Sequence, residues 1–165
     1  MRTLVALLLL LGATLLQVTL LPRVRLLQGS GDLVLLVLLT WMLQEDNRPD
    51  WRLGVVAGVM VGYASALPDL LLIAGYGLAA FSCQQLNKRI WKMPLITLLS
   101  SVIAGTLLVH VLTLGYLWLS DNPISPADAF NLIILPTLLL NLILLLPINA
   151  LISELTKTIS PSGTP

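Results

Sequence analysis

The strongest constraint on how this chain folds is a run of about 26 residues, from Pro94 to Leu119, that contains no Asp, Glu, Lys or Arg. A helix of that length crosses the roughly 30 Å hydrocarbon core of a bilayer, where only helices and closed barrels satisfy their backbone hydrogen bonds. The chain as a whole is strongly apolar, with 57% hydrophobic residues, 10% charged residues and a mean hydropathy of +0.95. Soluble domains have about a quarter of their residues charged. The sequence therefore predicts an all-α, polytopic membrane protein without a soluble domain.

Turn residues and charges divide the chain into about six predicted transmembrane helices. Pro22 follows the first of these helices and Pro68 follows the third. Asp32 can cap the second, and Pro94 and Pro126 suit the first turn of the fifth and sixth. The predicted helices are 4–21, 32–43, 53–67, 70–86, 94–119 and 126–155. The second and third are short, so they either cross the bilayer or form a re-entrant pair. The basic turn between them favours crossing.

Other features concern the two ends of the chain. The N-terminal apolar run has no small-x-small cleavage site, which indicates an uncleaved first helix. Residues 125–128 have the pattern of a capping box, and Pro136 and Pro147 are expected to bend the same face of the last helix. We expect residues 1–155 to form one transmembrane domain and residues 156–165 to be a disordered cytoplasmic tail.

Positive charges predict the orientation, because cytoplasmic loops carry an excess of Lys and Arg. With the N-terminus in the cytoplasm, most basic residues fall inside and only Arg23 and Arg25 fall outside. Both termini of a six-helix chain are then cytoplasmic. The residues expected to set this topology are Arg48, Arg52, Lys88, Arg89 and Lys92.

Small residues recur at every fourth position of the predicted helix 53–67, and a second small face lies on helix 94–119. The positions are Gly54, Gly58, Gly62 and Ala66 on the first, and Ser101 and Gly105 on the second. Such faces let helix backbones approach closely in lipid. We interpret 53–67 as the central helix, with the second face as a natural mate for the first. The alternative is that one or both faces bind a partner helix.

Few polar side chains lie inside the predicted helices, and these are the candidates for a site. His110 is the only histidine. An ionisable residue within a membrane is a functional hypothesis, although a neutral histidine also ties helices together by hydrogen bonds. Asp69, Asn141 and Asn149 are further candidates for a pocket or for such ties. With one cysteine and no recognisable catalytic motif, the sequence predicts no metal site, no cofactor and no enzyme.

Three stretches in the first half of the chain carry a resemblance to a known family. They are GDLVLLVLLTWML (31–43) before a short charged turn, GVVAGVMVG (54–62) and IAGYGLAAF (73–81). In this order they resemble the MreD family, which are rod-shape-determining proteins of the bacterial inner membrane. The resemblance covers residues 17–87, and beyond Met93 only length and hydropathy agree. Family members often carry an acid where this chain has Ala66, and Asp69 is the nearest acid, so the role of that acid does not transfer.

The resemblance implies a function in the regulation of cell shape and in the synthesis of lateral peptidoglycan. MreD-like proteins belong to the elongasome, where they associate with MreC, whose single membrane helix is the expected partner. Through MreC they connect to MreB filaments, to the glycosyltransferase RodA and to its transpeptidase. The resemblance also implies a fold similar to that of transporter S components. Membrane lipid is a further expected partner, a homodimer stays open, and no nucleic acid is expected.

Two other functions stay open at this point. One is a vitamin-binding S component of an uptake transporter, a class that usually has an A-x-x-x-A pattern on its first helix. Here Ala6, Gly12 and Ala13 lack that spacing, and few polar residues are present to hold a vitamin. The other is a generic helical scaffold.

Overall fold

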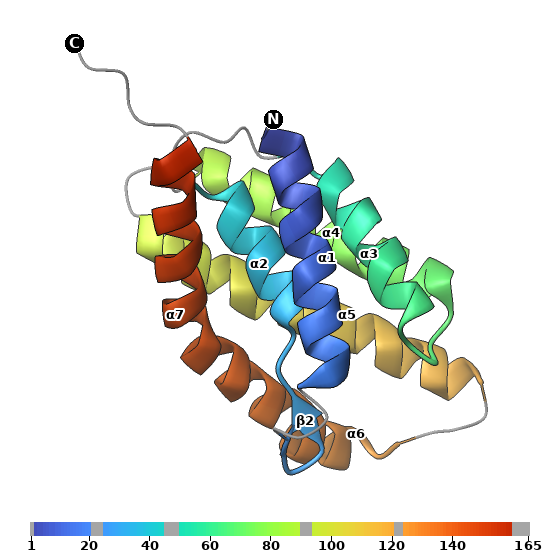
Figure 1. The fold of residues 1–165 in the computed structure, drawn as a ribbon. Helices are drawn as coiled ribbons and strands as arrows, with labels where there is room; N and C mark the ends of the chain where they lie inside the picture. The colour runs from blue at the N-terminus through green and yellow to red at the C-terminus, as the bar shows by residue number, and fades with distance from the viewer. Residues whose placement is uncertain (1, 21–24, 45–49, 90–93, 121–123, 160–165) are drawn as a thin grey trace.

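The structure is a computed structural model of the chain and describes residues 2–20, 25–44, 50–89, 94–120 and 124–159. These residues form a helical bundle with a two-residue antiparallel ladder, in which Arg25 pairs with Ser30 (Figure 1). The elements are α1 (Arg2–Thr19), β1 (Arg25–Leu26), β2 (Gly29–Ser30), α2 (Leu33–Met42), α3 (Arg52–Tyr63), α4 (Asp69–Arg89), α5 (Pro94–Leu119), α6 (Pro126–Asp128), the π-helix η2 (Ala129–Ile134) and α7 (Leu135–Ile159).

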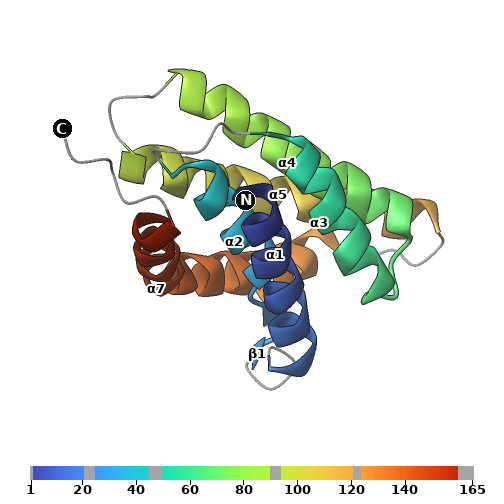
Figure 2. The ribbon, with the colours of Figure 1, turned by 45° about the horizontal axis from the view of Figure 1, so that its top comes forward.

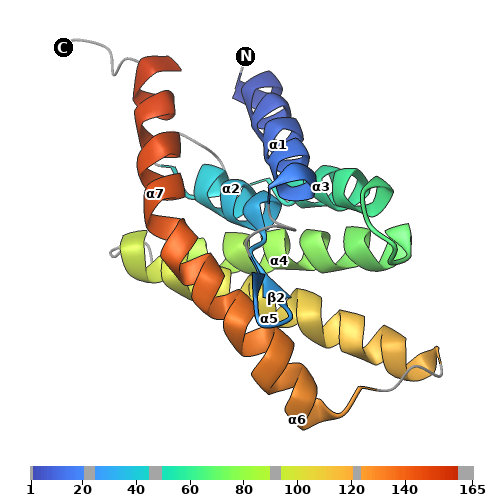
Figure 3. The same ribbon diagram turned by 60° about the horizontal axis from the view of Figure 1, so that its bottom comes forward.

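Successive helices alternate in direction, so the two ends of the bundle differ (Figure 1). α1 and α3 begin at the end where α4 and α7 finish, and we call this the charged end. The β-ladder and α6 lie at the opposite end, which we call the hairpin end. In the turned views, α2 lies among α1, α7, α4 and α5, and it contacts all four (Figure 2, Figure 3).

α2 is the buried centre of the bundle. Val34, Leu36 and Leu39 are 0% exposed, and most of the other residues of this helix are also buried. Its sequence, LVLLVLLTWM, is apolar on almost every face, which is typical of a helix enclosed on all sides. The interpretation of 53–67 as the central helix is therefore wrong, because α3 lies to one side, along α4.

Within the described ranges, three helical segments are long and apolar enough to cross a membrane: Arg2–Thr19, Pro94–Leu119 and Pro126–Thr158. Their outward side chains include Leu8 and Leu146, which are 59% and 67% exposed. An apolar surface of this extent fits acyl chains rather than water. α2 and α3 have 10 and 12 residues and rise only about 15 and 18 Å, so each is too short to cross the hydrocarbon core alone.

The last predicted helix runs continuously through α6, η2 and α7. It begins at Pro126 as predicted, but the side chain of Ser125 makes no capping hydrogen bond, so the expected capping box does not form. The π-helical segment ends two residues before Pro136. α7 continues to Ile159, so the prediction of a disordered tail is wrong for residues 156–159. The rest of that tail lies outside the described residues.

The glycine face of α3 packs against α4 within the chain. A Cβ atom added at Gly58 would lie 2.5 Å from the Cα of Ile73. One added at Gly62 would lie 2.9 Å from a carboxylate oxygen of Asp69. Gly54 meets α4 one turn earlier in the same way. The predicted close approach of backbones is confirmed for these three glycines.

Two details of the small-residue prediction are wrong. α3 ends at Tyr63, so Ala66 lies beyond the helix and is exposed. The second small face is buried against α2 and α4 rather than α3. A Cβ atom added at Gly105 would lie 3.3 Å from Leu39 and 3.4 Å from Ala79. Ser101, on the same face, is 1% exposed. The mate of the glycine face is therefore α4, which packs against both α3 and α5.

Candidate functional site

Polar side chains from α1, α4, α5 and α7 meet around the residue that precedes α2. We call this group the polar centre; it consists of Gln17, Asp32, Tyr76, Thr106 and Asn141. As predicted, Asp32 caps α2, because its Oδ1 accepts a hydrogen bond from the Leu35 amide at 3.0 Å. Its Oδ2 accepts a hydrogen bond from the Tyr76 hydroxyl at 2.6 Å. One carboxylate thus both caps the central helix and joins it to α4.

The polar centre also joins α2 to α7 and α5. The Asp32 amide donates to the side-chain oxygen of Asn141 at 2.7 Å. The side-chain nitrogen of Asn141 in turn donates to the hydroxyl of Thr106 at 3.0 Å. Asn141 is 0% exposed, so its side-chain amide uses both its hydrogen-bond acceptor and its donor in the interior. Its predicted role as a tie between helices is confirmed.

Gln17 supplies the contact with α1. Its side-chain oxygen accepts a hydrogen bond from the Val34 amide at 3.0 Å, and its side chain also lies within hydrogen-bonding reach of Asp32 and Tyr76. The first amides of a helix have no partner within the helix. In lipid each such group costs several kcal/mol if it stays unpaired. The polar centre therefore allows α2 to begin inside the bundle instead of at its surface.

The other predicted polar candidates do not all join this group. His110 is half-buried, and its Nδ1 donates to the backbone oxygen of Thr106 at 2.8 Å, one turn earlier on α5. Asn149 is half-buried on α7, about 12 Å further along the helix than Asn141. Asp69 is exposed at the start of α4, against Gly62. Only His110 thus lies beside the polar centre.

A short segment before α2, residues 27–32, lies against the last helix around Pro136, and we call it the strap. The amide of Gln28 donates to the backbone oxygen of Leu132 at 3.1 Å. The amide of Ser30 donates to the hydroxyl of Thr137 at 3.2 Å. Asp32, at the end of the strap, belongs to the polar centre. The strap and the polar centre therefore form one hydrogen-bonded system.

A second candidate site is an apolar groove on the outer side of α3 and α4, which we call the α3–α4 groove. It has a volume of about 580 Å³ and is open to the outside. Gly77 lies in it, and a Cβ atom added there would meet only Val55, at 3.6 Å. The groove is lined by Trp51, Val55, Ile73, Ala74, Gly77, Leu78 and Phe81.

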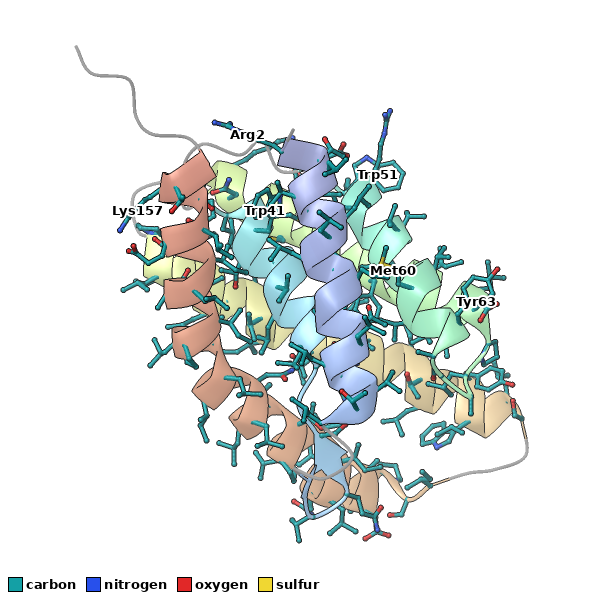
Figure 4. All side chains as sticks on the ribbon, viewed as in Figure 1. Arg2, Trp41, Trp51, Met60, Tyr63 and Lys157 are labelled. Carbon is teal, nitrogen blue, oxygen red and sulfur yellow. The ribbon has the colours of Figure 1, made fainter. Side chains whose placement is uncertain are left out.

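Charged side chains gather at one end of the bundle. Arg2, Arg52, Lys88 and Lys157 all belong to the ends of helices at the charged end, where Figure 4 labels Arg2 and Lys157. Lys157 forms an exposed ion pair with Glu154 at 2.8 Å. Of the other residues expected to set topology, Arg48, Lys92 and the side chain of Arg89 lie outside the described residues.

The aromatic residues only partly match the expected interfacial positions. Trp51 and Trp118 are 44% and 53% exposed near helix ends, as interfacial anchors should be. Trp41 also lies near the end of a predicted helix, where an interfacial anchor is expected, but it is 5% exposed and packs with Ala6 and Ile152 between α1 and α7. It is therefore part of the core.

Tyr76 is the member of the polar centre that no sequence pattern singled out. It lies in an apolar, glycine-containing run and is 1% exposed, although tyrosine is usually only partly buried. Gln17 is the one strongly polar residue of the first predicted helix, and the sequence marks Asp32 only as a helix cap. A polar residue alone in an apolar helix was the available signal, because in lipid such a residue needs a partner.

The chemistry of the polar centre is that of a structural tie. Its donors and acceptors are engaged with one another and with the backbone of α2. Among the described residues, no group of three or more His, Cys, Asp or Glu side chains is placed to hold a metal ion. No protein-family model, no curated protein and no solved structure matches this chain.

Proposed function

We propose that this chain is a non-catalytic scaffold of the cell-shape and peptidoglycan elongation machinery, and that it docks the membrane helix of an MreC protein in the α3–α4 groove. One observation carries the proposal. Six of the seven residues that line this groove come from two of the three stretches that resemble the MreD family: Val55 from 54–62, and the five residues on the α4 side from 73–81. The stretches that suggest the family thus also build an open surface on the bundle.

The dimensions and chemistry of the groove fit a membrane helix. From Ile73 to Phe81 it extends about 12 Å along α4, which corresponds to about two turns of a partner helix. Its lining is apolar apart from the indole nitrogen of Trp51. Gly77 leaves room for an inserted side chain, and helices associate in lipid through close van der Waals contact at such small residues. The glycine face of α3 is not part of this surface, because α4 already covers it.

We also propose that the bundle crosses a bacterial inner membrane six times, with its charged end in the cytoplasm. Alternating helix directions and the basic residues of that end support this orientation. Labelling with a membrane-impermeant maleimide tests it in Cys83→Ala cells. Asp128→Cys should react from outside, whereas Lys157→Cys should react only after permeabilisation. The reverse pattern would contradict the orientation.

The docking proposal is tested by filling the groove. In Gly77→Leu the added Cβ meets only Val55 of α3, at the ordinary van der Waals distance of 3.6 Å, so the fold should persist while the side chain fills the groove. At equal expression, we expect recovery of MreC with the purified chain to fall about tenfold, the effect of about 1.4 kcal/mol. Gly115→Leu is the matched control, because a Cβ atom there has nothing within 4 Å.

Equal recovery of MreC with both variants would remove the groove from the interface. If Gly77→Leu kept MreC but lost a co-purified phospholipid, the groove would be assigned to lipid instead. A disulfide between Leu78→Cys and a cysteine scanned along the MreC helix gives an independent test. Leu146→Cys on α7, which is 67% exposed, serves as the control for collisional crosslinking.

The alternative function, a vitamin-binding S component, needs polar groups that can turn to a ligand. In the polar centre the Asn141 amide uses both its oxygen and its nitrogen within the chain. The Asp32 carboxylate also uses both oxygens. The scaffold is therefore the better supported proposal. A vitamin that raised the melting temperature of the purified chain in detergent would reverse this preference.

A further inference from the structure

Pro136 follows the π-helix η2, and a proline beside a π-turn is expected to bend a helix there. We refer to this place as the bend; Pro147 lies further along, inside α7. Pro136 also leaves a backbone acceptor that the strap satisfies. Proline has no amide hydrogen, so Pro136 cannot donate to the backbone oxygen of Leu132, four residues earlier. That oxygen instead accepts a hydrogen bond from the Gln28 amide at 3.1 Å. A π-helix lies immediately before the bend, at Ala129–Ile134. Irregular helical turns of this kind often mark places where a helix changes shape.

The conformation of the strap is built for this position. Leu27 has a φ of 56°, a left-handed conformation that is unfavourable for a leucine. Gly29 lies against the bend so closely that an added Cβ would be 2.7 Å from the Thr137 nitrogen and 2.8 Å from Pro136 Cβ. Any other residue at this position would push the strap away from α7. The unfavourable backbone at Leu27 is therefore held by the contacts that follow it.

The other end of the strap is fixed to α4. Asp32 bonds to Tyr76 at 2.6 Å, and its amide bonds to Asn141 at 2.7 Å. Asn141 lies one turn beyond Thr137, which accepts from Ser30. Along η2 and α7 the strap thus contacts Leu132, Thr137 and Asn141 in succession, and a single side chain, that of Asp32, joins it to α4.

We infer that residues 27–32 form a strap that sets the bend of the α6–η2–α7 helix, and that the Tyr76–Asp32 hydrogen bond is the catch that keeps the strap closed. With the catch released, the strap leaves the bend and the helix adopts a different or wider range of angles. Tyr76 directly precedes Gly77 of the α3–α4 groove. The strap therefore links the helix that lines the groove to the hairpin end of the bundle.

The bend angle can be measured by double electron–electron resonance on the full chain in nanodiscs. Nitroxide labels at Phe130→Cys and Ile143→Cys, in a Cys83→Ala background, sit on exposed positions on either side of Pro136, and both precede Pro147. In a straight helix they would be about 20 Å apart, which is within range. Gly29→Ala should broaden or shift the distance distribution. Gly12→Ala is the matched control, because a Cβ atom there has nothing within 4 Å.

The catch is tested by Tyr76→Phe, which removes only the hydroxyl. We expect the same change in the distance distribution, and about tenfold faster hydrogen exchange at the amides of Gln28 and Ser30, the effect of losing one ordinary hydrogen bond. Tyr63→Phe, at a tyrosine 86% exposed, should change neither. An unaltered distribution in Gly29→Ala, or unaltered exchange in Tyr76→Phe, would overturn the inference.

Discussion

Replacing Gly58 by alanine tests the contact that joins α3 to α4. The added methyl group would meet backbone, with the Cα of Ile73 at 2.5 Å and the backbone oxygen of Leu72 at 2.7 Å. Neither atom can rotate away as the end of a side chain could. The two helices must therefore move apart along this contact, where the packing of the glycine face is closest.

Two opposing effects determine the size of the change. Alanine favours a helix over glycine by about 1 kcal/mol through backbone entropy. Overpacking of a tight interior costs about 1–3 kcal/mol, and contact with backbone places Gly58 toward the upper end. Gly115→Ala gains the first effect without the second, because its Cβ position is open. We expect Gly58→Ala to be less stable than Gly115→Ala by about 1–3 kcal/mol.

Unfolding in mixed micelles of mild detergent and increasing SDS, followed by tryptophan fluorescence, measures this difference. Both variants carry the same substitution in a helix, so the change in helix propensity cancels between them. The result that would refute the reasoning is equal stability of the two variants. It would mean that α3 and α4 separate at no cost, and that the glycine face does not set their distance.

Three further predictions concern the interior. Asn141→Leu should lower stability by about 1–2 kcal/mol more than Asn149→Leu in the same assay. It removes two hydrogen bonds, which average about 0.6 kcal/mol each between helices in membranes, and it leaves their partners unpaired. Equal losses of stability in the two variants would contradict the polar centre. Asp32→Ala should cost about 0.5–2 kcal/mol for the lost helix cap, plus the bond to Tyr76, and its effect should exceed that of Asp69→Ala. Cys83, which is 0% exposed, should react with a maleimide only after SDS unfolds the chain, and fast labelling of the native protein would contradict its place in the core.

The parts of the fold that depend on short segments were predictable from the sequence. α5 has the predicted bounds, because a proline begins it and its apolar run is uninterrupted. The cap of α2 was also predictable, because it is local in the sequence: Asp32 and the Leu35 amide from which it accepts are three residues apart. The end of α3 was not, because the residues after Tyr63 include no strong helix breaker before Pro68.

The identity of the central helix depended on how two signals were weighed. Glycines at every fourth position predicted close packing, and they do pack closely, but one glycine face needs only one neighbour. α2 is short and apolar on almost every face, and such a helix has no side that prefers contact with the interface or with water. All-round hydrophobicity was therefore the better indicator of the centre than the most regular small-residue pattern.

The polar centre could not be assembled from the sequence, because its contacts join residues that are far apart in the chain. Tyr76 is 44 positions from Asp32, and Asn141 is 109 positions from it. Each residue alone had a plain structural explanation, and only the packing of α4 and α7 on either side of α2 brings them together. A helix that begins inside an apolar bundle must have its first amides satisfied there. The polar residues of the neighbouring helices meet that requirement, and their positions along those helices follow from where α2 begins.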